Sequence, residues 1–181
     1  MIRTPALTLS LLFGITMIAA AQATDSSSSS KASSGSTGLS YDAATKTVTF
    51  ALVAGAPGST SGPFNFNGYT SGAGTFVVPA GAKVVMSFVN EDGTPHSAIV
   101  IQGDGPLPNI GGDPAIPGAY TRDVTQGLAQ FGNDVLKFTA PATGTYRIIC
   151  GVPGHALSGM WIWFKIDPAA KTPSFGATKQ P

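Results

Sequence analysis

The sequence has little of the chemistry that most enzymes and nucleic-acid-binding proteins use. Its 181 residues include one cysteine, two histidines and 10% charged residues, against about 25% charged in an average protein. A single cysteine cannot form an internal disulfide. Ten basic and nine acidic side chains nearly balance, so the sequence predicts no surface for nucleic acid or an anionic membrane. Few carboxylates must take up protons as the pH falls, which favours an acidic habitat; the alternative is that the low charge serves a partner-binding surface.

No apolar run reaches the roughly 20 residues of a membrane-spanning helix. The apolar segment 6–20 follows Arg3 and ends at a small-x-small cleavage site, which is typical of an export signal over residues 1–23. The alternative is an uncleaved anchor, because the Ser/Gly-rich leader 24–38 would make a flexible tether. The sequence therefore predicts an exported protein, in the periplasm or at the outer face of the cell membrane.

Residues 39–167 predict one all-β domain, an antiparallel Greek-key β-sandwich or barrel. Short runs of β-branched and aromatic residues recur between glycines and prolines, and no long amphipathic helix is evident. The expected strands cover residues 47–53, 75–78, 83–90, 97–102, 135–139, 145–150 and 160–166.

Two stretches depart from this strand pattern. Residues 103–134 form a long Gly/Pro-rich excursion with at most a short helix near 125–131, and loops of that length are usually functional or covering. Residues 168–181 are polar, contain prolines and show no periodicity. We expect this tail to be irregular.

The candidate chemistry lies in residues 150–160, where Cys150, His155 and Met160 share one loop between two strands. The other histidine, His96, lies in the turn between two earlier strands and would be the fourth ligand. Singly, each has an ordinary structural explanation, such as a buried thiol or a core thioether. Together, two histidines, one cysteine and a weak axial methionine match a blue-copper electron-transfer centre. Zinc would prefer four strong ligands or an open position for water, and Met86 lies mid-strand as a core residue.

Two motifs give the chain a resemblance to a known family. The spacing Cys-x4-His-x4-Met with an upstream histidine resembles the cupredoxins, and the stretch "CGVPGHALSGMW" resembles the sulfocyanins among them. The stretch "FNFNGYTSG" at 64–72 is similar to the sulfocyanin signature Phe-Asn-Phe-Asn-Gly, with Tyr69 as a departure. The resemblance implies one copper ion, with His96, Cys150 and His155 as equatorial ligands and Met160 as the axial ligand.

The residues next to the ligands carry further expectations. Ser97 follows the first histidine where many plastocyanin-like proteins have asparagine, and in this the chain is similar to rusticyanin; we expect a high reduction potential. For residues 64–67, one interpretation places the aromatic rings in the core and uses the asparagines to hold a turn. The other places an asparagine amide beside the metal loops, and both can hold together.

Apolar residues flank His155 and predict a docking surface with the imidazole edge as the electron port. The alternative is ordinary loop packing. We also expect bulky aromatic residues after Met160, with the long excursion, to exclude water from the ligands. The docking candidates are Val152, Pro153, Ala156 and Leu157, and the expected covering aromatics are Trp161, Trp163 and Phe164.

The sequence and the resemblance together predict a one-electron carrier in an exported respiratory chain. A cytochrome donor, a membrane terminal oxidase as acceptor and a monomeric state are the partner expectations, with iron and sulfur respiration both compatible. A multicopper enzyme would need further histidines, and a binuclear centre would need a second cysteine; the chain has neither. The alternatives are copper delivery or storage, or a secreted β-sandwich adhesion module.

Overall fold

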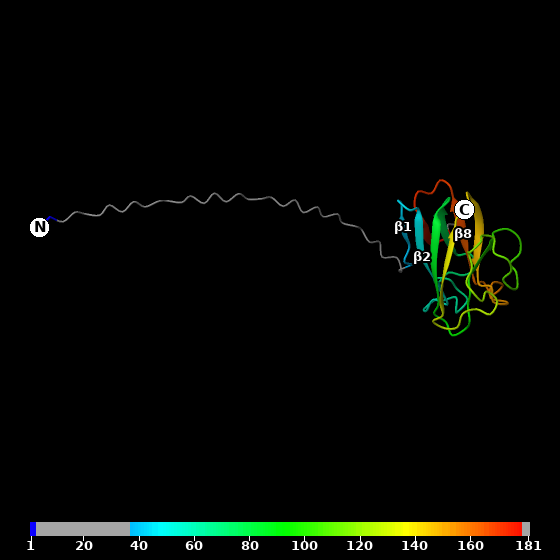
Figure 1. The fold of residues 1–181 in the computed structure, drawn as a ribbon. Helices are drawn as coiled ribbons and strands as arrows, with labels where there is room; N and C mark the ends of the chain where they lie inside the picture. The colour runs from blue at the N-terminus through cyan, green and yellow to red at the C-terminus, as the bar shows by residue number, and fades with distance from the viewer. Residues whose placement is uncertain (3–36, 179–181) are drawn as a thin grey trace. The chain divides into compact units, whose positions relative to one another are not determined.

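The computed structural model describes residues 1–2 and 37–178, and every regular element in that part is a β-strand (Figure 1). Nearly all of the expected signal at 1–23 and of the leader at 24–38 lies outside the described residues, as do 179–181. Where the structure describes the chain, no helix is long and apolar enough to span a membrane. The strands are β1 (Ser40–Asp42), β2 (Thr47–Ala54), β3 (Gly74–Pro79), β4 (Lys83–Asn90), β5 (Ile99–Gln102), β6 (Asn133–Thr139), β7 (Gly144–Ile149), β8 (Trp161–Asp167) and β9 (Ser174–Ala177).

These strands form two sheets, with orders β1-β2-β4-β6 and β5-β7-β8-β3-β9. The predicted all-β sandwich is confirmed, but its strands are not all antiparallel, because β2 pairs with β4 and β3 with β8 in parallel. Between β2 and β4 the chain crosses to the other sheet to form β3, so it re-enters the first sheet in its original direction. Residue alternation predicts which side of a strand is buried, but it does not predict strand direction.

The core lies between the sheets and follows the alternation of their strands. In β2, Val48, Phe50, Leu52 and Ala54 are buried and the residues between them face outward. Phe50 stacks on Phe76 of the opposite sheet with ring centroids 4.3 Å apart. Met86 is fully buried in this cluster, which confirms its prediction as a core residue.

The C-terminal tail is more ordered than its composition predicts. We expected residues 168–181 to be irregular, but β9 pairs antiparallel with β3 and completes the edge of the five-stranded sheet. The four residues Ser-Phe-Gly-Ala carry no clear strand pattern. Their hydrogen-bonding partner exists only once β3 is in place, so the sequence pattern alone could not predict this strand. The short hairpin strand β1 was missed for the same reason.

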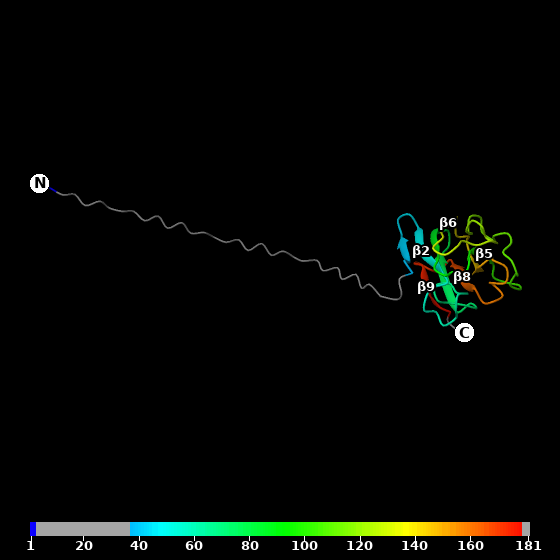
Figure 2. The same cartoon turned by 90° about the horizontal axis from the view of Figure 1, so that it is seen from below.

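The excursion between β5 and β6, where we expected at most a short helix near 125–131, has none there; these residues form turns and one isolated bridge. Gly127 adopts φ +74°, which interrupts a helical path. The excursion runs beside β5, where Val100 donates its N–H to Ala119 and Thr121 donates to Ala98. Figure 2 shows this segment on the β5 side of the domain, away from β2.

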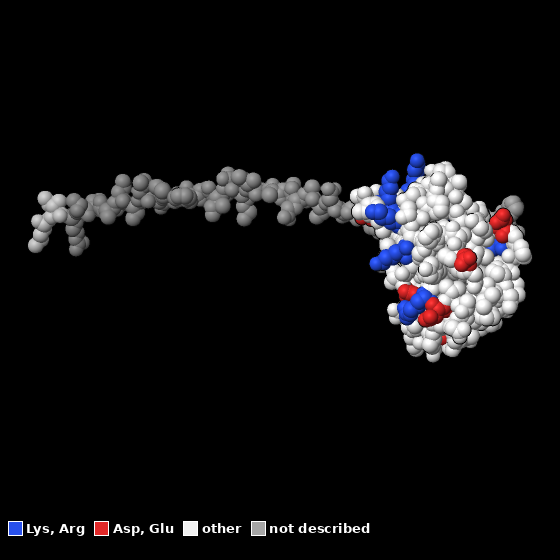
Figure 3. All heavy atoms as spheres, turned by 45° about the vertical axis from the view of Figure 1, so that its right-hand side comes forward, with Lys and Arg blue, Asp and Glu red and all other residues white. Residues whose placement is uncertain are grey.

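Charged side chains are sparse on the domain surface. Most of the face in Figure 3 is uncharged, and lysine and arginine side chains gather along one edge of it. Lys83 begins β4 and the chain leaves that strand at Asn90 toward His96. This lysine therefore lies at the opposite end of the sheet from the turn that carries the first candidate ligand.

Candidate metal centre

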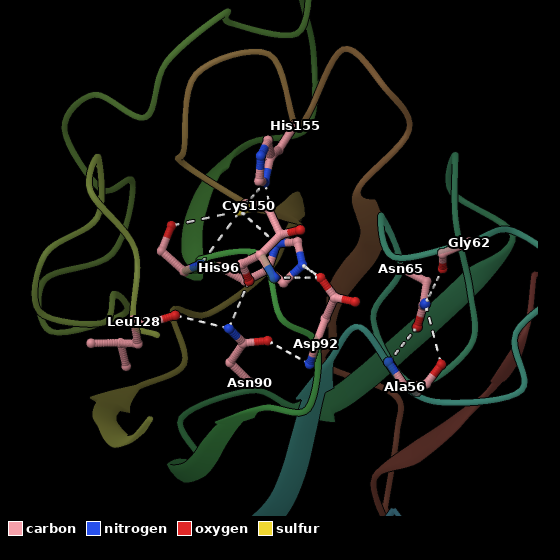
Figure 4. Close-up of polar contacts among 11 residues, drawn as sticks. Ala56, Gly62, Asn65, Asn90, Asp92, His96, Leu128, Cys150 and His155 are labelled. Atoms are coloured by element: carbon pink, nitrogen blue, oxygen red, sulfur yellow. Dashed lines mark hydrogen bonds and ion pairs between the residues drawn. The ribbon is translucent and has the colours of Figure 1, made fainter. Parts of the chain in front are cut away.

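Three candidate ligands from distant parts of the chain meet at one end of the sandwich. His96 lies in the connection between β4 and β5, Cys150 directly follows β7, and His155 lies in the loop that leads to β8. The Nδ1 atoms of the two histidines are 3.2 Å apart, and Cys150 Sγ lies 3.9 Å from His96 Nδ1 and 3.4 Å from His155 Nδ1 (Figure 4). The three side chains are 0%, 1% and 9% exposed for His96, Cys150 and His155.

This triangle has the dimensions of a three-coordinate metal plane. Donors about 2.0 to 2.3 Å from a central ion in a trigonal arrangement lie roughly 3.6 Å apart, and the three observed separations fall on either side of that value. No carboxylate belongs to this cluster among the described residues. Two imidazoles and one thiolate in a trigonal plane are the donor set that suits copper.

Burial sets the protonation of the three donors when no ion is bound. It lowers the pKa of His96 to about 4, with the nearby His155 acting in the same direction and Asp92 opposing it. Burial also lowers the pKa of His155, again opposed by Asp92. It raises the pKa of the Cys150 thiol, although hydrogen bonds from the backbone of Ser97 and Val152 oppose the rise. The imidazole lone pairs are therefore free at neutral pH, whereas a metal ion must displace the thiol proton.

Met160 is the last residue of the same loop, directly before β8. Its carbonyl accepts a 3.0 Å hydrogen bond from the Cys150 N–H, and its own N–H donates to the His155 carbonyl at 3.0 Å. The side chain is fully buried. The loop from Cys150 to Met160 is thus closed by its own backbone, which holds all three predicted residues of the loop in a fixed relation.

The comparisons with known proteins agree with this geometry. Residues 34–175 match the family model described as the sulfocyanin (SoxE) domain. The chain belongs to the sulfocyanin family. Sulfocyanins are cupredoxins, which bind copper, and the cluster of two histidines and one cysteine fits that ion. This confirms the predicted family and cofactor.

Individual relatives support the same assignment. A sulfocyanin from Sulfolobus acidocaldarius is 34% identical over 128 residues, which cover 67% of this chain and 64% of the relative. Rusticyanin from Acidithiobacillus ferrooxidans is 36% identical over 92 residues, covering 48% and 56% of the two chains. The chain thus spans less than two thirds of these relatives' lengths. A crystal structure of a rusticyanin variant superposes with a TM-score of 0.50 at 26% identity, covering 67% of this chain and 78% of that one.

The turn that carries His96 in this sulfocyanin is held by groups that the sequence did not single out. The His96 N–H donates to the Leu128 carbonyl, and the Leu128 N–H donates back to His96. The buried Asn90 side chain donates at 2.8 Å to both Leu128 and Thr94 carbonyls. Asn90 is the last residue of β4, and its role in holding this turn is evident only from its complete burial in the structure.

Ser97, the residue after His96, contacts the sulfur of Cys150. Its backbone N–H points at Cys150 Sγ at 3.4 Å, and its hydroxyl lies 3.8 Å from that sulfur. The hydroxyl donates to the Val124 carbonyl at 2.6 Å and accepts the Gly151 N–H at 2.9 Å. Its single proton is therefore used by Val124, and the hydroxyl joins the excursion to the cysteine loop.

The residues of the motif at 64–67 have different surroundings: some lie in the core, some hold a turn and one lies beside the site. Phe66 is fully buried, and the Asn65 amide holds the turn through Gly62, Ala56 and Gly68. Asn67 bonds to the backbone of β2, so the core-and-turn interpretation holds and neither amide touches the ligands. Phe64 was not predicted at the site, yet its ring lies 4.8 Å from the His155 ring and 6.3 Å from the His96 ring.

The residues around His155 are not equally accessible. Leu157 is 58% exposed, Pro153 is also exposed and Val152 is half-buried. Ala156 is 1% exposed and packs with Ile99 and Ile149, so its predicted place on a docking surface is wrong. A small methyl group at that position fills an internal gap, which the sequence could not distinguish from surface.

Only part of the expected aromatic cover lies near the ligand loops. Trp161 packs against the small cluster that contains Ala156. Phe164 lies in the main core, and Trp163 stacks against Arg147 on the outside of the sheet. The excursion supplies the rest of the cover, because Gly111 donates its N–H to the Gly151 carbonyl and Val124 packs against Gly151.

Proposed function

We propose that this protein is a one-electron carrier in which His96, Cys150 and His155 hold a copper ion, with Met160 as the weak axial ligand. The buried triangle of two Nδ1 atoms and one Sγ supports this most directly. When bound, copper supplies the Cu(I)/Cu(II) couple, and the polypeptide supplies a site that changes little between the two states. The axial assignment rests on the burial of Met160 and its backbone bonds to both Cys150 and His155.

The hydrogen bonds around the ligands support fast electron exchange. His96 is bonded in both directions to Leu128, and the Cys150 to Met160 loop is closed at its ends. Ligands held this way need not rearrange when the ion gains or loses an electron.

His155 is the proposed electron port. It is the more exposed of the two histidines, and exposed Pro153 and Leu157 lie on its loop. A small apolar surface with few charges suits brief contacts with a redox partner, because such contacts must dissociate quickly. We propose a cytochrome as donor and a membrane terminal oxidase as acceptor, with the protein acting as a monomer.

The cellular setting is also proposed. An export signal or N-terminal anchor at 1–23 would place the domain in the periplasm or at the outer face of the membrane, as part of a respiratory chain. The low content of carboxylates suits an acidophile, because few native carboxylate groups then take up protons as the pH falls.

The test is a titration of the full-length protein with Cu(II), followed by its visible spectrum. We expect an intense blue or green charge-transfer band with one equivalent of copper, and its loss in Cys150→Ser, which removes the thiolate and keeps a side chain of similar size. A colourless wild-type complex would overturn electron transfer. Copper delivery or storage would then explain the same residues.

A further inference from the structure

The His96 ring faces two different groups through its two nitrogens. Nδ1 points at His155 and Cys150, whereas Nε2 lies 3.5 Å from the Asp92 carboxylate (Figure 4). Among the described residues, Nε2 is a buried nitrogen with no hydrogen-bond partner, because the approach of Asp92 is longer than a good hydrogen bond. Asp92 therefore places an acceptor close to this nitrogen.

The Asp92 carboxylate is held in place by the turn around it. The Asp92 N–H donates to the Asn90 side-chain oxygen at 2.9 Å, and the Thr94 N–H donates at 2.7 Å to the carboxylate oxygen that approaches His96. The Asp92 side chain also packs closely against Gly55, because a Cβ added at Gly55 would lie only 2.3 Å from the Asp92 Cβ. Gly55 also has φ +62°, so a side chain is disfavoured there twice over.

Metal binding decides where the His96 proton must lie. A neutral imidazole carries one N–H, so an ion at Nδ1 leaves the proton on Nε2. That N–H is buried and faces Asp92. Metal-bound histidines generally donate this second N–H to a carboxylate or carbonyl, and the acceptor fixes the tautomer and raises the basicity of the ring.

We propose that Asp92 is a positioning residue for His96, selecting the tautomer with a free Nδ1 and strengthening the ring as a ligand for Cu(II). The proposal rests on the proposed ligand set. A negative charge on the far side of the ring favours the more positive oxidation state of the ion. Asp92 therefore tightens Cu(II) binding and lowers the reduction potential, in opposition to the apolar cover of the site.

The experiment compares three variants of the full-length protein. Asp92→Asn removes the charge but keeps an oxygen for the Thr94 N–H, and Asp92→Ala removes both. Glu91→Gln is the matched control, because Glu91 is the adjacent carboxylate and is exposed, whereas Asp92 is the carboxylate that approaches His96. Thermal melting checks that each variant folds, and Asp92→Asn decides the test if Asp92→Ala does not.

Two kinds of measurement separate this role from a merely structural one. In the metal-free protein, long-range proton–nitrogen NMR should show the His96 proton on Nε2 in the wild type and a shift toward Nδ1 in Asp92→Ala. In the copper-loaded protein, Asp92→Ala should bind Cu(II) about tenfold more weakly, and both Asp92 variants should have a higher reduction potential. Glu91→Gln should change neither the tautomer nor the affinity.

Unchanged tautomer, affinity and potential in folded Asp92→Asn and Asp92→Ala would overturn the proposal. Equal shifts in Glu91→Gln would also overturn it, because they would show a general charge effect. If the wild type binds no copper, the proposed function fails, but the metal-free NMR comparison still decides whether Asp92 sets the His96 tautomer.

Discussion

The two histidines of the site are held in different ways. His96 is fully buried, is bonded through its backbone to Leu128 and faces the Asp92 carboxylate. His155 is 9% exposed, lies on a loop whose Pro153 and Leu157 face solvent, and has the Phe64 ring beside it in a T-shaped contact. One ligand is fixed by hydrogen bonds and charge, whereas the other is bounded by apolar contacts at the surface.

The difference separates two requirements of an electron carrier. A redox centre needs a ligand whose geometry and charge do not change, and a partner needs a short path to the ion. Placing both requirements on one histidine would expose the fixed ligand to water. In the proposed carrier, the turn after β4 would meet the first requirement and the loop before β8 the second, and both lie at the same end of the sandwich.

The largest predicted effect concerns acid and the metal-free protein. Burial lowers the pKa of His96 from 6.5 to about 4, so the unfolded chain binds this proton at a higher pH than the folded one. The free energy of unfolding should be highest above pH 6.5 and fall by roughly 3 kcal/mol between there and pH 4. Below pH 4 this group should cause no further loss.

Chemical denaturation across that pH range measures the effect. His96→Gln lacks the titrating ring and should flatten the profile more than His155→Gln, because His155 is less buried. The same pH dependence of unfolding free energy in both variants would contradict the prediction that His96 dominates the loss of stability in acid.

Asn90→Ala should weaken the hold on His96. The change leaves the Leu128 and Thr94 carbonyls without their side-chain donor in a buried region, which costs about 2 kcal/mol. Denaturation measures the loss. Asn65→Ala is the control, since that buried amide also holds a turn but touches no ligand. We expect similar destabilisation from both and a changed copper spectrum only from Asn90→Ala; identical spectra would contradict the anchoring role.

Leu157→Lys should slow electron exchange through His155. Two molecules that meet at this loop would then repel each other, and self-exchange between the reduced and oxidised forms should fall about fivefold at low salt. NMR line broadening in mixtures of the two forms measures this rate. Val135→Lys adds the same charge at an exposed strand position on β6 and should have little effect. An unaltered self-exchange rate in Leu157→Lys, with an unaltered spectrum, would contradict the proposal that electrons pass through His155.

Ser97→Asn should lower the reduction potential by the equivalent of about a tenfold change or less in the redox equilibrium. The larger amide cannot fill the buried space of the hydroxyl without disturbing its bonds to Val124 and Gly151. Water that reaches the sulfur would stabilise Cu(II). Voltammetry measures the potential, and Ser97→Ala serves as the smaller control; an unchanged potential in Ser97→Asn would refute the predicted role of this residue.

Much of the site could be predicted because its chemistry is scarce in this sequence. With one cysteine and two histidines, any site of this class must use Cys150, His96 and His155. The strands were also predictable, since β-branched and aromatic residues alternate in β2 and β4. Ala156 was misplaced because a small apolar residue suits both a surface loop and an internal gap.

The sequence by itself determined the candidate ligand residues, the loop that carries three of them and the all-β class, because these depend on residue type and local spacing. Only the tertiary structure decided the parallel pairing of β2 with β4, the closing strand β9, and the placement of Asn90, Asp92 and Phe64 around the ligands. These features depend on contacts between segments far apart in the chain. Such contacts are fixed by packing and hydrogen bonding after the sheets assemble, and a local pattern does not encode them.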